Sequence, residues 1–221
     1  MKKYILLILC LSFSLFTFAR PQKRQVVKDT ICNASIETMT KVAERFCYEF
    51  QACPDSLFKW AFRGTGSSQS ANKTKQTKDS KDAIQLVYKD RVYDPKRKTG
   101  DVAIDIYVLG VRWWKDTHLG TKRVLSRPAN AQYPLTEHMT ATYTGSLLES
   151  GDFILKMEPI SSNQTRVHYE FTLTFGKVLS SFISDKTWTN AIEWRLERIF
   201  DNIVEFAETG QVTKKKRNPK K

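Results

Sequence analysis

Residues 166–175 read Arg-Val-His-Tyr-Glu-Phe-Thr-Leu-Thr-Phe, and hydrophobic side chains occupy every second position of this stretch. This period of two predicts a β-strand with one covered face, because successive side chains of a strand point to opposite sides. After Gly176 the period changes, and hydrophobic residues recur every three or four positions. Residues 186–208 are therefore predicted to form one long amphipathic helix that ends before Gly210.

More alternating segments lie upstream of this strand. They start near four hydrophobic residues: Ile84, Val102, Met139 and Phe153. Short polar connections at 149–152 and 161–164 are typical of hairpin turns, so neighbouring strands are expected to be antiparallel. Residues 116–134 look irregular, with one weak strand at 122–126. In all, the pattern predicts five to seven antiparallel strands in a curved sheet that packs on the C-terminal helix, an α+β architecture.

The N-terminal third is predicted to contribute one further helix, from residue 33. Its hydrophobic residues share one helical stripe: Ile36, Met39, Ala43, Phe46 and Phe50. Asn33 or Ser35 is a suitable N-cap, and Pro54 interrupts the helix. Residues 20–32 are polar and are predicted to be a flexible leader. Residues 64–82 contain no large hydrophobic side chain and are predicted to form a mobile insertion.

The chain has 221 residues and a formal net charge of +13, which is partly a property of its C-terminal tail. We expect one domain at 33–212, followed by a disordered basic tail at 213–221. The tail holds six cationic residues: Lys214, Lys215, Lys216, Arg217, Lys220 and Lys221. Such a run is either simply solvated or a contact to an anionic surface such as a membrane. The rest of the chain contains no recognisable nucleic-acid-binding motif.

The first 19 residues are typical of a secretory signal peptide. Lys2 and Lys3 precede an apolar run at 5–18, and small residues before Arg20 allow cleavage after Ala19. A membrane anchor is the alternative, but the run is shorter than the roughly 20 apolar residues that span a bilayer. We therefore expect an exported protein, periplasmic or extracellular.

Three cysteines remain after such a cleavage: Cys32, Cys47 and Cys53. An oxidising compartment allows one disulfide and leaves one thiol. Cys47–Cys53 is the predicted pair, because Pro54 favours a turn that would bring Cys53 back towards the helix. The alternative is that all three are small buried apolar side chains.

The order of the predicted elements resembles the START-like, or Bet v 1-like, helix-grip superfamily over about residues 83–208. The resemblance is carried by the stretch Thr-Arg-Val-His-Tyr-Glu-Phe at 165–171 and the long helix after it. It implies a curved antiparallel sheet around a C-terminal helix, and a hydrophobic or lipid-like ligand held between the two. The chain departs from the simplest members in lacking an obvious first strand before residue 33 and in having the insertion at 64–82.

The predicted function is thus non-catalytic binding of a hydrophobic small molecule, with a densely filled core as the competing interpretation. The candidate cavity-lining residues are Ile106, Trp114, Tyr143, Met157, Tyr169, Phe171, Phe175, Trp188, Ile192, Leu196 and Ile199. The alternative function is a cell-envelope structural protein that contacts anionic surfaces through its tail, and an enzyme ranks last. No paired acid and base, metal motif or cofactor motif is recognisable, and the sequence does not specify an oligomeric state.

Overall fold

The structure, a computed structural model, describes residues 22–65, 67–69, 84–108, 111–127, 135–143, 148–180 and 184–213. The elements in chain order are β1 (Gln22–Cys32), α2 (Ile36–Ala52), α3 (Pro54–Trp60), β2 (Ser67–Gln69), β3 (Ile84–Asp94), β4 (Thr99–Val108), β5 (Val111–Ser126), β6 (Leu135–Tyr143), β7 (Leu148–Ser161), β8 (Gln164–Phe175), α4 (Lys177–Ser180), α5 (Asp185–Thr187), the π-helix η1 (Trp188–Glu193) and α6 (Trp194–Thr209).

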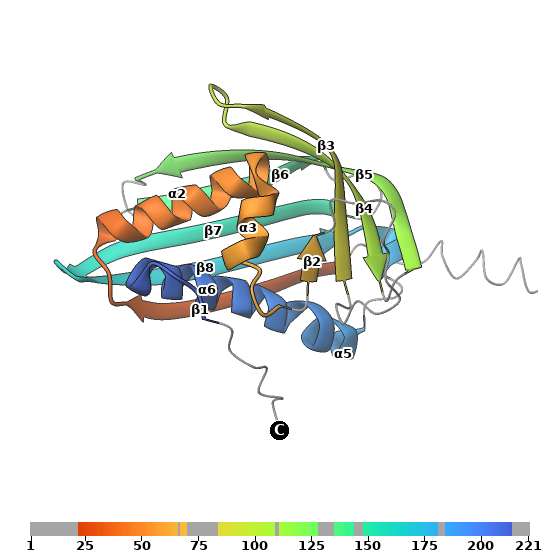
Figure 1. The fold of residues 1–221 in the computed structure, drawn as a ribbon. Helices are drawn as coiled ribbons and strands as arrows, with labels where there is room; N and C mark the ends of the chain where they lie inside the picture. Colours follow the sequence, from red (N-terminus) through yellow and green to blue (C-terminus); the bar gives the residue numbers. More distant parts are fainter. Residues whose placement is uncertain are drawn as a thin grey trace, which may run out of the picture.

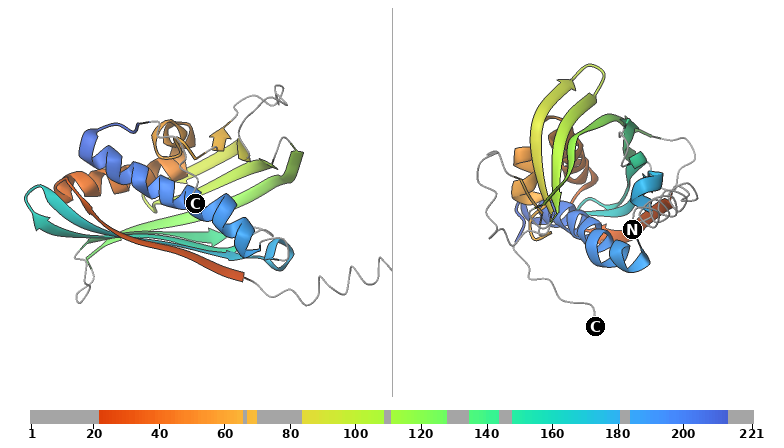
Figure 2. Two further views of the ribbon diagram at one scale, coloured as in Figure 1. Left: turned by 90° about the horizontal axis from the view of Figure 1, so that it is seen from below. Right: turned by 90° about the vertical axis from the view of Figure 1, so that its right-hand side faces the viewer.

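The described strands form one curved sheet in the order β1-β8-β7-β6-β5-β4-β3-β2. All neighbouring pairs are antiparallel except the three-residue strand β2, which runs parallel to β3. Helices α2, α3 and α6 lie on one side of the sheet (Figure 1), and the left view of Figure 2 shows α2 and α6 above β1, β8 and β7. The predicted α+β architecture, with a curved antiparallel sheet and a C-terminal helix, is confirmed.

The prediction of a flexible leader at 20–32 is wrong for residues 22–32. These residues form the edge strand β1, which pairs with β8 along its whole length, from Gln22 opposite Phe175 to Cys32 opposite Thr165. The strand was missed because its inner face carries cations. The Lys28 ammonium lies 2.5 Å from Asp201 on α6 and 5.6 Å from the centre of the Phe200 ring.

Helix α2 and the C-terminal helical run formed by α5, η1 and α6 begin and end close to where the sequence predicts. Ser35 caps α2, since its hydroxyl accepts a hydrogen bond of 3.2 Å from the Thr38 backbone N–H. The C-terminal helical run ends at Gly210, whose φ of 73° lies in the left-handed region that favours glycine. Between α5 and α6 the run passes through the π-helical turn η1, which the hydrophobic spacing did not indicate.

Polar contacts between side chains and backbone connect helices α2, α3 and α6 to one another. The Glu49 carboxylate accepts hydrogen bonds of 2.7 Å from the Trp60 indole N–H and from Arg45. Arg45 also lies 4.8 Å from the centre of the Phe206 ring on α6. From α6, the Asn202 amide donates to the backbone carbonyls of the turn that follows α3. The helices therefore form one layer against the sheet.

The weak strand expected at 122–126 is the end of a much longer one. Strand β5 runs from Val111 to Ser126 and pairs with both β4 and β6, so the expectation of irregular structure from 116 is wrong as far as 126. It bends at Asp116, where φ is 49°. Alternation was hidden there because polar side chains occupy both faces around the bend.

Several expectations lie mostly or wholly outside the described residues. They concern the signal peptide at 1–19, most of the insertion at 64–82 and the tail from Lys214 onward. Among the helices that the structure does describe, none combines the length and hydrophobicity needed to cross a membrane.

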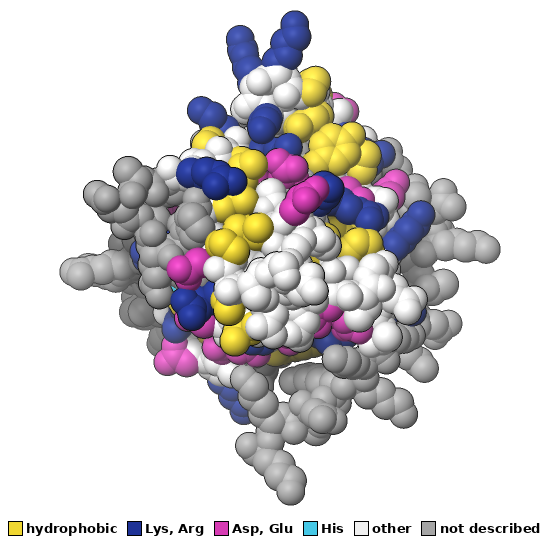
Figure 3. Space-filling view, turned by 90° about the vertical axis from the view of Figure 1, so that its left-hand side faces the viewer, with side chains coloured by type: hydrophobic (Ala, Val, Ile, Leu, Met, Phe, Trp, Pro, Cys, Tyr) yellow, Lys and Arg dark blue, Asp and Glu magenta, His cyan; other side chains and the backbone are white. Residues whose placement is uncertain are grey.

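The surface at the α2 end of the molecule mixes charge and hydrophobic groups. Figure 3 shows Lys and Arg side chains extending at the top, where the β3–β4 hairpin of Figure 1 lies. Below them, hydrophobic side chains alternate with carboxylates and cations. This face therefore carries both signs of charge and not one continuous basic surface.

Candidate ligand-binding site

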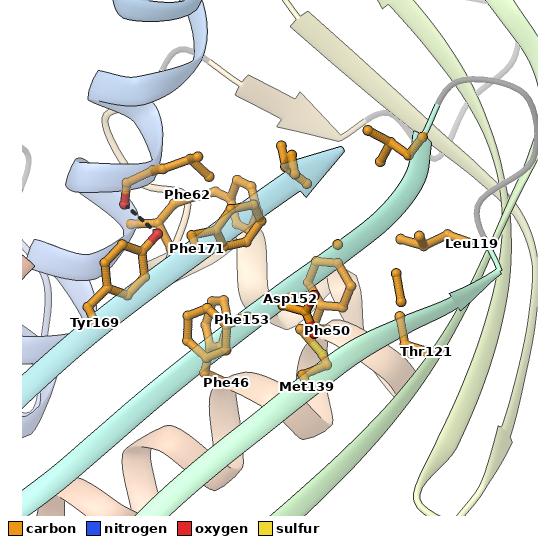
Figure 4. A pocket seen from close by; sticks show the side chains of 16 residues that line it. Phe46, Phe50, Phe62, Leu119, Thr121, Met139, Asp152, Phe153, Tyr169 and Phe171 are labelled. Atoms are coloured by element: carbon orange, nitrogen blue, oxygen red, sulfur yellow. Dashed lines mark hydrogen bonds between the residues drawn. The ribbon is translucent and has the colours of Figure 1, made fainter. Parts of the chain in front are cut away.

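A cavity of about 270 Å³ lies between the sheet and the helical layer. Its walls come from α2, the turn after α3, strands β5 to β8 and α6, and Figure 4 shows their side chains directed towards the same space. The lining residues are Phe46, Phe50, Phe62, Leu119, Thr121, Met139, Ala141, Leu148, Gly151, Asp152, Phe153, Tyr169, Phe171, Leu173, Leu196 and Ile199. Ligand-binding cavities commonly measure about 300–1,000 Å³, so this one lies just below that range.

The space exists because two inward positions of the sheet carry almost no side chain. Gly151 on β7 and Ala141 on β6 both face the helices, and a Cβ added to Gly151 would lie 3.6 Å from the Ala141 methyl. Further along the same strands the inward residues are large, and Leu155 and Met157 are fully buried. The cavity therefore occupies the end of the helix–sheet space where the sheet side chains are small.

Aromatic rings form a continuous wall along one side of the cavity. The Phe153 ring lies 4.9 Å from that of Phe46 on α2, 5.7 Å from that of Tyr169 and 6.2 Å from that of Phe171, measured between ring centroids. These distances are typical of favourable edge-to-face and tilted ring contacts. Because neighbouring rings hold each other, this wall is formed before any ligand arrives.

The polar groups of the described lining are already engaged within the protein. The Tyr169 hydroxyl donates to the Leu196 carbonyl at 3.4 Å, and burial raises the pKa of Tyr169 well above its usual value, so the hydroxyl stays neutral. The Thr121 hydroxyl accepts from the Gln51 side chain at 3.1 Å and donates to a backbone carbonyl. Asp152 Oδ1 lies 3.0 Å from His138 Nε2, on the outer face of the sheet. The inner surface is thus apolar.

A buried carboxyl group lies two positions along β6 from the cavity. Glu137 is 1% exposed and faces the helices, and among the described residues neither of its oxygens accepts a hydrogen bond from a nitrogen or hydroxyl donor. Burial raises its pKa, and the Arg123 guanidinium opposes that shift only in part. The Cys47 thiol on α2 lies beside it, and burial together with this carboxyl raises the pKa of Cys47 well above its usual value. This group was not identified from the sequence, because Glu137 stands at a position of β6 where the alternation predicts an inward-facing hydrophobic side chain.

The structure brings together four of the predicted lining residues. Tyr169, Phe171, Leu196 and Ile199 line the cavity. Four others lie elsewhere in the core and do not reach the cavity. Met157 is fully buried at the filled end, Phe175 and Trp188 pack against each other with ring centroids 6.0 Å apart, and Ile192 packs beside the core. The side chains of Ile106, Trp114 and Tyr143 lie outside the described part of the chain.

The residues that were missed come mostly from the N-terminal helix and from β6 and β7. Phe46 and Phe50 belong to the hydrophobic stripe recognised in the sequence, but that stripe did not reveal which part of the sheet α2 covers. Met139 and Phe153 were on the inward faces of predicted strands. Gly151 was read as part of a turn, since a lone glycine gives no signal for an inward-facing position.

The predicted disulfide is not formed, because Cys32, Cys47 and Cys53 are all free. Cys47 points from α2 into the core, whereas Cys53 is the C-cap residue and interacts with the Tyr48 hydroxyl. Six residues of helix place two side chains about 120° apart around the axis, which separates the two sulfur atoms. The predicted anionic-surface residues from Lys214 to Lys221 lie outside the described residues. Within the described residues, no group of His, Cys, Asp and Glu is arranged to hold a metal ion.

No protein-family model and no curated protein matches this chain. Similar solved structures include the Zhui aromatase/cyclase from a Streptomyces species, with 9% identity, 85% of this chain and 94% of that chain covered, and a TM-score of 0.48. A START superfamily protein from Mycobacterium smegmatis has 10% identity, 85% and 99% coverage and a TM-score of 0.47. Truncated norcoclaurine synthase from Thalictrum flavum has 7% identity, 86% and 96% coverage and a TM-score of 0.47.

The order of elements in this chain agrees with the resemblance to a helix-grip fold noted from the sequence. A first strand, two helices, a run of antiparallel strands and a C-terminal helix follow one another, and the helices cover one face of the sheet. The strand that the sequence did not reveal, β1, removes the departure noted for the region before residue 33.

Proposed function

We propose that this protein binds a hydrophobic small molecule in the cavity between sheet and helices, without catalysing a reaction. The observation that carries the proposal is the aromatic, preformed cavity itself. A ligand that buries about 200 Å² of apolar surface gains about 5 kcal/mol at 25 cal/mol per Å². A gain of about 5 kcal/mol corresponds to a dissociation constant of about 0.2 mM. Because association costs offset part of this gain, we expect weak binding, with dissociation constants of about 0.2 mM or higher.

The absence of catalysis is part of the proposal and is supported by the polar groups of the described lining. The hydroxyls of Thr121 and Tyr169 are both donors to backbone carbonyls. A general acid or base must reach the substrate within hydrogen-bond distance. In the part of the chain that the structure describes, the carboxyl group of Glu137 lies behind the wall and not in it.

Fluorescence titration with N-phenyl-1-naphthylamine, an uncharged probe that becomes bright in apolar surroundings, tests the binding. We expect saturable binding of one probe per chain. The variant Ala141→Phe places a ring in the cavity and is expected to weaken binding at least about tenfold. Thr140→Phe, on the outer face of the same strand, is the matched control and should bind like the wild type. Absence of saturable binding, or equal binding by Ala141→Phe, would contradict the proposal.

We also propose that the chain is exported and loses residues 1–19. The charged start, the apolar run and the small residues before Arg20 support this proposal. The test is mass spectrometry of the full-length chain after expression in a host with a general secretory pathway. A mature species that begins at Arg20 outside the cytoplasm is expected. An uncleaved chain retained in the cytoplasm would contradict export and leave the ligand-binding proposal standing.

A further inference from the structure

The chemistry of the cavity wall also indicates which class of ligand fits it, an inference that rests on the proposed function. We propose that the ligand is a compact, uncharged ring compound and not an anionic lipid such as a fatty acid. The geometry behind this proposal is a small space, a wall of aromatic rings and the lack of any free hydrogen-bond donor among the described lining side chains.

The cavity wall offers few side-chain hydrogen-bond donors. Of the lining residues that the structure describes, only Thr121, Tyr169 and Asp152 have polar side chains. The hydroxyl protons of Thr121 and Tyr169 are both directed at backbone carbonyls. Asp152 interacts with His138 on the other side of the sheet. An anionic group placed in the cavity would therefore find no donor to replace its water.

The consequence for an anion is a large penalty. Moving an ionised group out of water is unfavourable unless it is paired and hydrogen-bonded. Arg123 on β5 is a cation near the cavity, but it is not part of the lining. Its guanidinium donates a hydrogen bond of 2.8 Å to the Glu44 carbonyl. The wall thus discriminates against anions even though the chain as a whole is strongly basic.

The shape of the site favours rings over chains. The rings of Phe46, Phe153 and Phe171 present faces and edges that match a flat aromatic ligand, in the offset and edge-to-face arrangements that aromatic pairs prefer. A volume of about 270 Å³ holds about nine water molecules at about 30 Å³ each. A compound of two or three rings fills such a space, whereas a long acyl chain exceeds it.

A matched pair of probes tests the charge preference directly. N-phenyl-1-naphthylamine and 8-anilino-1-naphthalenesulfonate share one ring system and differ by an anionic sulfonate. Titrations at about 0.15 M salt limit long-range attraction of the anion to the basic surface. Only the binding component that Ala141→Phe removes is compared. We expect the sulfonate to bind at least about tenfold more weakly than the uncharged probe. Equal or tighter cavity binding of the sulfonate would overturn the proposal.

A second variant should weaken the preference if the account is right. Leu148→Arg adds a donor to the half-buried edge of the wall, and Ser150→Arg adds the same charge on the outer side of the same strand. We expect Leu148→Arg to shift the affinity ratio of the two probes towards the sulfonate by about tenfold, and Ser150→Arg to leave it unchanged. An equal shift in both variants would show that general charge, and not the wall, sets the ratio.

Competition distinguishes rings from chains and separates this inference from the proposed function. Naphthalene is expected to displace the bound uncharged probe, and palmitate is not. Displacement by palmitate at lower concentration than by naphthalene would overturn the inference and leave cavity binding intact. If neither fluorescent probe binds, the proposed function itself fails, and the inference fails with it.

Discussion

The two ends of the space between helices and sheet differ in how the same strands fill it. At one end, β7 contributes Leu155 and Met157, both fully buried, and α2 adds Met39. At the other end, β7 contributes Gly151 and β6 contributes Ala141, and the cavity lies there. The comparison teaches that the fold does not by itself decide between a carrier and a solid core. The size of a few inward side chains decides it.

The largest expected difference between the two ends is in stability. Leu155→Ala, at the filled end, should lower the free energy of unfolding by about 2–5 kcal/mol, because a fully enclosed side chain leaves a cavity that the surroundings cannot close. Leu173→Ala, in the cavity wall, only enlarges an existing space and should cost about half as much or less. Urea unfolding followed by fluorescence measures both, and equal losses would mean that the two ends are packed alike.

Adding a methyl group should distinguish a tight contact between helix and sheet from the open space of the cavity. At Gly100 on β4, a Cβ would lie 2.9 Å from the Gln51 Cβ on α2, so Gly100→Ala should cost about 1–3 kcal/mol through overpacking. At Gly151 the nearest atom is 3.4 Å away, and Gly151→Ala should change the unfolding free energy by less than about 1 kcal/mol. Thermal unfolding of the two variants gives the comparison, and a larger loss for Gly151→Ala would contradict it.

The filled end should also respond to pH through Glu137. Burial raises the pKa of Glu137 above its ordinary value of 4.5, so the folded chain holds this proton more tightly than the unfolded chain. Its contribution to stability is therefore complete below the unfolded pKa and declines as pH rises through the folded pKa. The groups that face this carboxyl are Cys47 and Glu44 on α2, Arg123 on β5 and Lys98 in the β3–β4 turn.

Glu137→Gln removes this titration while it keeps the shape of the side chain. Relative to the wild type, the variant should gain stability with rising pH, because the amide does not titrate whereas the wild-type carboxyl group loses its stabilising effect as it gives up its proton. Urea unfolding at several pH values measures the difference. Glu149→Gln, at an exposed carboxyl group of β7, is the control. A wild type that becomes more stable relative to Glu137→Gln as pH rises would refute the assignment.

The smallest effect is expected at Tyr169, where the two ends meet. Tyr169→Phe deletes the hydroxyl that donates to the Leu196 carbonyl and should cost about 0.5–1.5 kcal/mol of stability. Affinity for N-phenyl-1-naphthylamine should stay within about twofold, because the hydroxyl points at α6 and not at the ligand. A much larger change in affinity would place the hydroxyl in contact with the bound molecule.

The sequence allowed most of the sheet and both long helices to be predicted, because their inward residues alternate or recur with clear periods. In the inward set of β8, Val167, Tyr169 and Phe175 are buried as expected, and Phe171 and Leu173 are partly buried. Strand β1 escaped detection because its exposed face carries Val27 and Ile31, while its inward face carries Arg24 and Lys28. Those cations pair with Asp185 and Asp201, more than a hundred residues away in the sequence, so no local pattern reveals them.

The site was predictable only in part for a similar reason. Strand periodicity identifies Tyr169 and Phe171 as inward, and helical periodicity identifies Leu196 and Ile199, but neither period says which inward residues meet an open space. That depends on where α2 crosses the sheet and on Gly151, whose missing side chain is informative only once its neighbours are known. The position of the cavity therefore depends on how α2, β6 and β7 lie relative to one another, which no single stretch of sequence specifies.

The most direct test of the central claim is a crystal structure of the protein grown with N-phenyl-1-naphthylamine. The account predicts density for the probe rings between α2 and the sheet, in contact with Phe50, Phe153 and Leu173. A probe bound elsewhere on the surface, or Leu148 and Leu173 packed into the space so that no room remains, would contradict it.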